Sequence, residues 1–251
     1  MLGKRQKICS KGCLVRYNIL TVLNEGYAQF GRLFINSLFD TIDLDSIDTI
    51  YIYDTGLSSN SKKYLSLFPK IKIVDAGFIA LSEDIHDKGW QKNTYSKTRF
   101  LKEVLVETGI PTIMIDADCV FKCEFIKLLD SNTDLTVCRR TRPGFSNHLG
   151  SFFAANNITK SINFLDKWID RIENSEGKHK ESPALSYVLE NQNILKIQEL
   201  DESVISALGD SSDVRIFHLK SDSGLETIER RINQPHLIPY IYRYLGELAN
   251  V

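Results

Sequence analysis

The sequence has 251 residues, 43% hydrophobic and 25% charged, and its 31 basic and 32 acidic residues give a net charge of −1. This is the composition of an ordinary globular protein, long enough to bury a substantial core in one large domain or two small ones. The balanced charge supplies no global basic field for nucleic acid, and no apolar segment is long enough for a signal peptide or a membrane span.

We therefore expect a cytoplasmic protein with no nucleic-acid partner and no transmembrane segment. The start of the chain, residues 1–11, is basic. Peripheral contact with a membrane, through this basic segment or through a partner, stays open. The five cysteines are scattered and odd in number, which favours reduced thiols over a zinc site.

Apolar periodicity predicts an alternation of strands and helices along most of the chain. Strands are predicted at 14–23, 49–53, 71–74, 112–115, 135–140, 151–156, 194–200 and 214–219. Helices are predicted at 27–39, 58–67, 95–108, 124–129, 158–172, 181–189, 225–232 and 239–248, and irregular segments at 75–93 and 143–150. This order favours an α/β fold with a mostly parallel central sheet flanked by helices.

Two carboxylates, Asp116 and Asp118, follow the predicted strand at 112–115 and are separated by one small residue, Ala117. In an α/β sheet, ligands bind at the carboxyl ends of the strands. Two carboxylates this close repel each other unless a cation lies between them, which points to a hard divalent ion, Mg²⁺ or Mn²⁺, shared with substrate phosphates. A solvated strand end without function is the alternative.

Two basic residues, Lys97 and Arg99, lie on the helix that leads into this strand. They are candidates to reach a diphosphate near the aspartate pair, and solvated helix charges are the alternative. His218 ends the last predicted strand and Lys220 follows it.

This order of parts resembles the metal-dependent glycosyltransferases of the GT-A fold, which use nucleotide-diphosphate sugars as donors, and in particular the glycogenin-like and lipopolysaccharide-galactosyltransferase-like members. Four features carry the resemblance: the polar loop after the first strand (21–27), the Lys97-Thr-Arg-Phe-Leu helix entering the Asp116-Ala-Asp118 strand, the Glu181-Ser-Pro-Ala-Leu motif, and His218 with Lys220 beyond it. In that family an acidic motif precedes the Pro-Ala-Leu helix start. Here Ser182 stands where the family has a second polar residue of Gln or Glu type.

The resemblance implies a role for each of these residues. Asp116, Asp118 and His218 bind the metal ion, with His218 as a neutral imidazole, and Lys97, Arg99 and Lys220 supply positive charge to the diphosphate. Glu181 faces the reacting sugar and acts with Asp118 as a catalytic residue, whereas Thr21, Asn24 and Asp54 contact the base and ribose. A core histidine is the alternative for His218, and a carboxylate favoured by the helix dipole is the alternative for Glu181.

The predicted function is transfer of a sugar from a UDP- or GDP-sugar to a glycan, lipid-linked or protein acceptor. The whole chain, 1–251, is expected to form one catalytic domain with a nucleotide-binding half (14–120), an acceptor half (121–222) and a C-terminal helical tail (223–251). Two alternatives are a haloacid dehalogenase-like phosphatase, which also places Asp-x-Asp after a strand, and a non-catalytic nucleotide-binding protein of the same fold.

Overall fold

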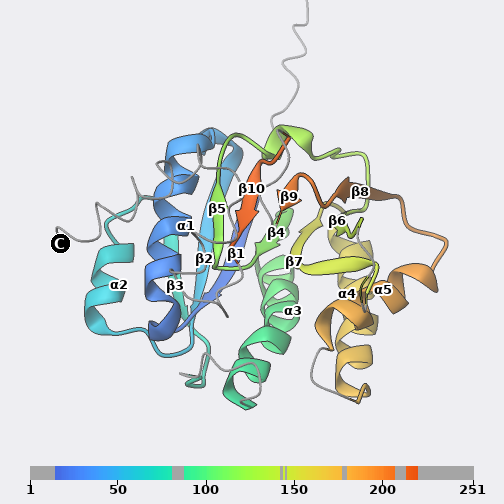
Figure 1. Cartoon of the computed structure of the whole chain (residues 1–251), viewed down its shortest axis with the longest axis horizontal. Helices are drawn as coiled ribbons and strands as arrows, with labels where there is room; N and C mark the ends of the chain where they lie inside the picture. Colours follow the sequence, from blue (N-terminus) through green and yellow to red (C-terminus); the bar gives the residue numbers. More distant parts are fainter. Residues whose placement is uncertain are drawn as a thin grey trace, which may run out of the picture.

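The computed structural model describes residues 15–80, 88–141, 144, 146–176, 180–206 and 213–219, apart from the side chains of residues 88–90 and 93. In this part of the chain a seven-stranded sheet has the order β3-β2-β1-β4-β7-β6-β8 (Figure 1). Its strands are β1 (Tyr17–Leu23), β2 (Ile47–Asp54), β3 (Ile71–Asp75), β4 (Thr112–Ile115), β6 (Leu135–Arg139), β7 (His148–Ala155) and β8 (Ile197–Asp201).

Strands β3, β2, β1 and β4 run parallel, β7 is antiparallel to both β4 and β6, and β6 is parallel to β8. A smaller sheet has the order β5-β10-β9, formed by β5 (Cys119–Phe121), β9 (Ile205–Ser206) and β10 (Ile216–His218). The predicted mostly parallel central sheet is therefore confirmed.

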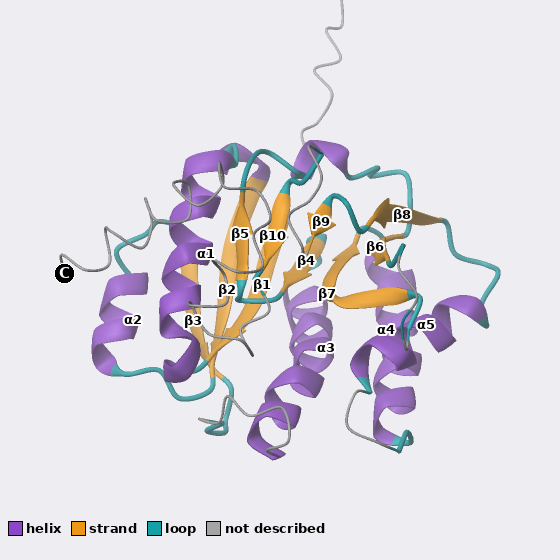
Figure 2. Ribbon diagram, in the orientation of Figure 1, coloured by secondary structure: helices purple, strands orange, loops and turns teal. Residues whose placement is uncertain are grey.

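Helices cover both faces of the large sheet (Figure 2). They are α1 (Ala28–Thr41), α2 (Ser59–Leu65), α3 (Lys88–Thr108), α4 (Ile158–Glu173) and α5 (Glu181–Glu190). One face packs against α1, α2 and the small sheet, and the other against α3, α4 and α5. Strand β1 is buried on both faces, which explains its nearly continuous apolar sequence.

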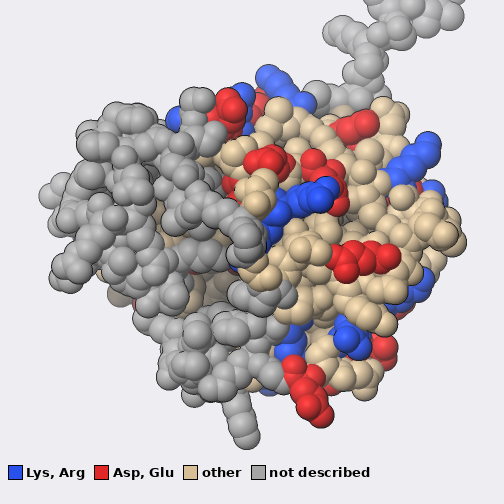
Figure 3. Space-filling model, turned by 45° about the vertical axis from the view of Figure 1, so that its right-hand side comes forward, with Lys and Arg blue, Asp and Glu red and all other residues tan. Residues whose placement is uncertain are grey.

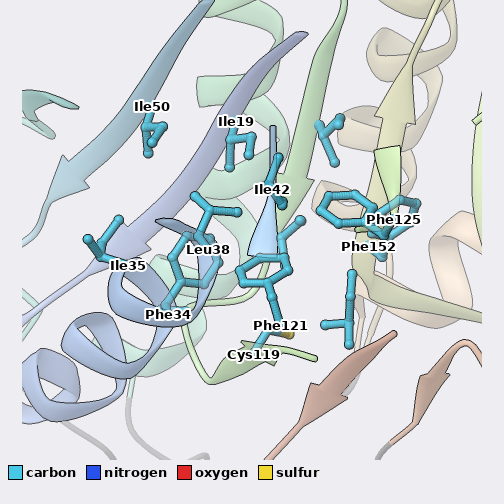
Figure 4. Close-up of a cluster of buried hydrophobic side chains, with 14 of the residues drawn as sticks. Ile19, Phe34, Ile35, Leu38, Ile42, Ile50, Cys119, Phe121, Phe125 and Phe152 are labelled. Carbon is cyan, nitrogen blue, oxygen red and sulfur yellow. The ribbon is translucent and has the colours of Figure 1, made fainter. Parts of the chain in front are cut away.

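Aromatic side chains join these layers. On the first face, the ring centroids of Phe34 from α1 and Phe121 from β5 lie 5.0 Å apart in an edge-to-face contact, and Figure 4 shows Phe125 and Phe152 extending this cluster. On the second face, the centroids of Phe153 from β7 and Trp168 from α4 are 5.3 Å apart. The strand ends are thus supported from both sides by rigid packing.

Side chains cap the starts of two helices. Ser58 Oγ accepts a hydrogen bond from Ser61 N at the start of α2, and Asn157 Oδ1 accepts one from Lys160 N at the start of α4, both at 3.2 Å. These caps fix the helices close to the predicted positions.

Several predicted boundaries were wrong. The segment 124–129 forms only a 3-10 turn, η3 (Ile126–Leu128); β7 begins at His148 rather than at residue 151; and α3 begins at Lys88 inside a segment predicted to be irregular. The only strong helix breaker near that start, Gly89, lies in the first turn of α3, so the residues after it can all continue the helix. Strands β5 and β9 were not predicted, because two or three residues are too few to show a periodicity.

The described residues leave some predictions untested. The helices predicted at 225–232 and 239–248 lie outside them, and the division into donor and acceptor halves stays a prediction. No helix of the described ranges is both long enough and apolar enough to cross a membrane. Acidic and basic side chains are interspersed on the face drawn in Figure 3.

Candidate functional site

The two aspartates lie in a turn between β4 and β5. Asp116 N donates to Ser151 O of β7 at 3.0 Å, and Cys119 N donates to Asp116 O at 3.2 Å, so the chain reverses immediately after β4. Because of this turn, Asp116 and Asp118 approach one region from the carboxyl end of the sheet, as their position after a buried strand predicted.

His218 is brought to the same turn from the far end of the chain by the small sheet. Strand β10 pairs with β5 so that His218 lies opposite Cys119, and Leu219 N donates to Asp118 O at 2.8 Å. The imidazole Nε2 is 3.2 Å from Asp118 Oδ1 and 3.6 Å from Asp116 Oδ2. One ligand atom from each of the three residues lies within 4.8 Å of the other two.

This donor set fits a divalent cation. Two carboxylates and one imidazole are ligands that first-row divalent ions accept, and carboxylates also suit Mg²⁺. Asp118 and His218 are buried and the Asp116 side chain is partly exposed, so the two carboxylate charges are only partly screened by water. The second ring nitrogen of His218, Nδ1, is buried and has no hydrogen-bond partner among the residues described. The side chains that the sequence assigned to the metal therefore do meet in space.

Lys97 enters the site from α3 and is itself buried. Its ammonium forms an ion pair with Asp116 and another with Glu181, where Nζ and Oε1 are 3.1 Å apart. Burial alone lowers the pKa of Lys97, but the carboxylates of Asp116 and Glu181 together outweigh that effect, so its pKa is raised. Lys97 thus stays positively charged and joins the Asp116 carboxylate to that of Glu181.

Glu181 is the first residue of α5 and its side chain is buried. Its main-chain oxygen accepts a hydrogen bond from Trp168 Nε1 at 3.0 Å. A carboxylate in the first turn of a helix is stabilised by the helix dipole, and here it also contacts the lysine of the site. Among the residues that the structure describes, the carboxylates of Asp116, Asp118 and Glu181 thus lie around this turn and Lys97, and carboxylate oxygens are ligands that suit a divalent cation.

The residues predicted to contact base and ribose lie at the same edge of the sheet, because β1, β2 and β4 are parallel. Asn24 is already engaged: its Nδ2 donates to Ala80 O and its Oδ1 accepts from Tyr27 N. The buried Thr21 Oγ1, by contrast, has no hydrogen-bond partner within the described ranges.

Asp54 organises the loop after β2. Its Oδ1 accepts hydrogen bonds from Gly56 N at 2.8 Å and Leu57 N at 2.6 Å, and its Oδ2 forms an ion pair with Lys62. The carboxylate therefore holds the loop in shape, and its contact with a nucleotide stays a prediction.

Arg99 is not brought into this group of residues. It lies two positions after Lys97 on α3, and side chains two apart on a helix point in nearly opposite directions. Its guanidinium is exposed and pairs with Glu173 of α4. Its phosphate contact also stays a prediction, and Lys220 lies outside the described residues.

Sequence reasoning did not connect Gly150 with the Glu181-Ser182 motif. Gly150 N donates to Ser182 Oγ at 2.9 Å, next to the Glu181 side chain. Gly150 ends a turn-rich stretch and therefore looked like a loop glycine. No signal in the sequence indicates that α5 packs against it.

The model of one protein family, described as nucleotide-diphospho-sugar transferase, matches residues 70–238, which is more than half of the chain. The chain belongs to this family. None of the curated proteins matches the sequence. The nucleotide-diphospho-sugar transferase match covers Lys97, the Asp116-Ala-Asp118 turn, Glu181 and His218.

Solved glycosyltransferase structures share the fold of this nucleotide-diphospho-sugar transferase. An active-site mutant of LgtC has a TM-score of 0.58 at 13% identity, covering 92% of this chain and 95% of LgtC. The bifunctional glycosyltransferase WbbM also has a TM-score of 0.58 at 13% identity, covering 92% of this chain and 52% of WbbM. GlyE from Streptococcus pneumoniae TIGR4 has a TM-score of 0.56 at 14% identity, covering 90% of this chain and 53% of GlyE.

The chain thus spans about half the length of WbbM and GlyE and nearly all of LgtC. The family match and the shared fold identify a glycosyltransferase enzyme of the GT-A fold.

Proposed function

We propose that this glycosyltransferase transfers a sugar from a UDP- or GDP-sugar to a glycan, lipid-linked or protein acceptor, and that it requires Mn²⁺ or Mg²⁺. One observation carries the proposal. In a member of the nucleotide-diphospho-sugar transferase family, the ligand atoms of Asp116, Asp118 and His218 lie within 4.8 Å of one another at the carboxyl end of β4.

In this proposal Asp116, Asp118 and His218 hold the divalent ion. When bound, such an ion supplies positive charge as a Lewis acid to the diphosphate that leaves the sugar. The support comes from the chemistry of the donor set, two carboxylates and one imidazole.

The remaining residues have positioning and proton-transfer roles. Transfer breaks the bond between the anomeric carbon and the diphosphate oxygen, forms a bond from that carbon to the acceptor oxygen, and releases the acceptor proton. Glu181 faces the sugar, where its carboxylate bonds the sugar hydroxyls or takes the proton. Lys97 orients Glu181 and Asp116 through its two ion pairs, and its predicted contact with the diphosphate stays a prediction.

The donor side is assigned to the other predicted residues. Thr21, Asn24 and Asp54 bind base and ribose at the ends of β1 and β2, and Lys220 approaches the diphosphate. The buried Thr21 hydroxyl supports this assignment, because among the described residues it has no hydrogen-bond partner of its own.

Neither alternative function gains support from the fold. The matched family is that of sugar transfer, and three strands precede the aspartate pair, whereas in the phosphatases this pair belongs to the first strand. A non-catalytic binding protein would keep the site geometry but would not turn over a donor.

A thermal-shift panel tests the proposal. Nucleoside diphosphates and nucleotide sugars are added, each with and without Mn²⁺, to the wild type and to Asp118→Ala. A ligand at a hundred times its Kd stabilises the native state by about 2.7 kcal/mol, which for a chain of this size raises Tm by roughly 5–10 °C. We expect one nucleotide to give this shift only with metal and only in the wild type. No shift with any nucleotide under any metal condition would remove the basis of the proposal.

A further inference from the structure

The contact between β7 and α5 contains a glycine that the backbone does not require. Gly150 is not among the described residues with positive φ, so an alanine could adopt its backbone conformation without strain. The space beside it is nevertheless filled by Glu181. A Cβ added at position 150 would lie 2.8 Å from Glu181 Cδ and 2.9 Å from both Cγ and Oε2. These distances are shorter than carbon atoms tolerate, so one of the two groups would have to move.

The backbone on both sides of this contact is held by hydrogen bonds. Ser182 Oγ accepts from Gly150 N, and Ser186 Oγ, one helical turn further, accepts from His148 N, both at 2.9 Å. Trp168 Nε1 donates to Glu181 O and so holds the start of α5 against α4. An added methyl group is therefore accommodated by the Glu181 side chain rather than by a shift of α5 or β7.

The position of the Glu181 side chain matters because its carboxylate contacts Lys97. Glu181 Oε1 is 3.1 Å from Lys97 Nζ, and Lys97 also pairs with Asp116 of the metal-site turn. A methyl group that pushes Cδ outward by half an ångström or more moves the carboxylate relative to this lysine and to the sugar. A displacement of about 1 Å at a reacting group costs on the order of a hundredfold in rate.

We propose that Gly150 is a positioning residue for glycosyl transfer: it leaves the space that the long side chain of Glu181 needs to reach Lys97, while Ser182 fixes the start of α5. This inference rests on the proposed function of Glu181. It assigns to Ser182, the position at which the sequence departs from the family pattern, the role of an anchor to β7. Gly150 and Glu181 then form a matched pair, in which a shorter carboxylate tolerates a larger neighbour.

A double-mutant cycle tests the pairing. Gly150→Ala, Glu181→Asp and the combined variant are compared with the wild type by donor turnover, followed as release of the nucleoside diphosphate with water or an acceptor, and by melting temperature. Asp lacks one methylene, so it withdraws the carboxylate from the added methyl group. In the protein with Glu at 181, we expect Gly150→Ala to lower kcat by about tenfold or more and to change the KM for the donor by less. In the Glu181→Asp background, we expect the same substitution to lower kcat by less than about threefold.

Gly31 provides a matched control, because a Cβ there would lie 2.6 Å from Leu23 Cδ1, in the packing of α1 on β1. Gly31→Ala should change turnover by the same factor with Glu or Asp at 181. The pairing is overturned if Gly150→Ala has wild-type activity, or if it costs the same factor in both backgrounds.

The outcome stays readable if the variant folds poorly or the donor assignment fails. If Gly150→Ala lowers the melting temperature strongly, recovery of that temperature by Glu181→Asp supports the pairing and its absence overturns it. If the wild type itself turns over no donor, the proposed function fails, whereas the melting-temperature cycle still decides the steric pairing.

Discussion

Replacing Lys97 by methionine removes the ammonium that joins two carboxylates but keeps most of the side-chain volume. In the native protein this ammonium is buried between Asp116 and Glu181. After the change, the carboxylates of Asp116 and Glu181 lose the ammonium that they share, and the Glu181 side chain is buried. We expect a large loss of stability and a loss of transfer activity in the same variant.

The size of the effect follows from the geometry. At the observed 3.1 Å between Lys97 Nζ and Glu181 Oε1, an effective dielectric constant of about 20 gives a Coulomb energy of about 5 kcal/mol. Desolvation of the buried charges offsets part of this gain. Removal of one partner from a buried ion pair typically costs about 3–5 kcal/mol, which predicts a fall in Tm of roughly 6–20 °C for a chain of this size.

Lys102→Met is the matched control, because Lys102 lies on the same helix and pairs with Asp166 at the surface. An exposed pair contributes about 0–1 kcal/mol, so this variant should melt within a few degrees of the wild type. Urea unfolding of the three proteins measures the difference directly. If Lys97→Met costs no more than Lys102→Met, the account of a buried ionic link is wrong.

The link also predicts a pH dependence. The pKa of Lys97 is raised above its ordinary value of 10.5, so the stability it contributes is complete below that pH and is lost only as pH rises through the higher folded-state pKa. The stability difference between the wild type and Lys97→Met should therefore be constant from about pH 7 to about pH 9. A difference that shrinks within this range would contradict the raised pKa.

Three further variants test separate parts of the structure. Trp168→Phe removes the hydrogen bond to Glu181 O and replaces a fully buried indole by a smaller phenyl ring, so it should cost more in urea unfolding than the about 0.5–1.5 kcal/mol of a hydrogen bond alone. Burial alone would raise the pKa of Asp134. Hydrogen bonds from Lys196 N and from the Lys160 side chain lower it by more than burial raises it, so the pKa lies below its ordinary value of 3.8. The stability advantage of the wild type over Asp134→Asn should thus persist above about pH 5 and shrink as pH falls below 3.8. Arg99→Met should leave Tm within about 2 °C, because its ion pair is exposed; a fall in donor affinity in this variant would support the predicted phosphate contact.

Strong local patterns made much of the fold predictable. The apolar run of β1 and the apolar stripe of α4 are local features, and each marks an element that the structure contains. Strands β5 and β9 are not local features. Each exists because β10 lies beside it, so tertiary pairing rather than propensity decides their formation.

The site residues, too, divide into those that a local pattern marks and those that only tertiary packing brings together. Asp116 and Asp118 attract notice in the sequence because they follow a buried strand, and only the resemblance to a family associated them with His218, about a hundred residues later, beside which they lie in the structure. Lys97 and Arg99 could not be separated in the sequence, since only the packing of α3 decides which one faces the sheet. The role of Gly150 depends on where α5 begins against β7, which no local pattern states.

Donor turnover with and without metal tests the central claim most directly. The donor that gives the thermal shift is incubated with the wild type in Mn²⁺, in Mg²⁺ and in chelator, and release of the nucleoside diphosphate is followed, with Asp118→Asn as the isosteric control. The account predicts release by the wild type only when metal is present, and a loss of at least about a hundredfold in Asp118→Asn, because one charged ligand is removed from the ion that stabilises the leaving group. Equal release in chelator, or wild-type release by Asp118→Asn, would contradict it.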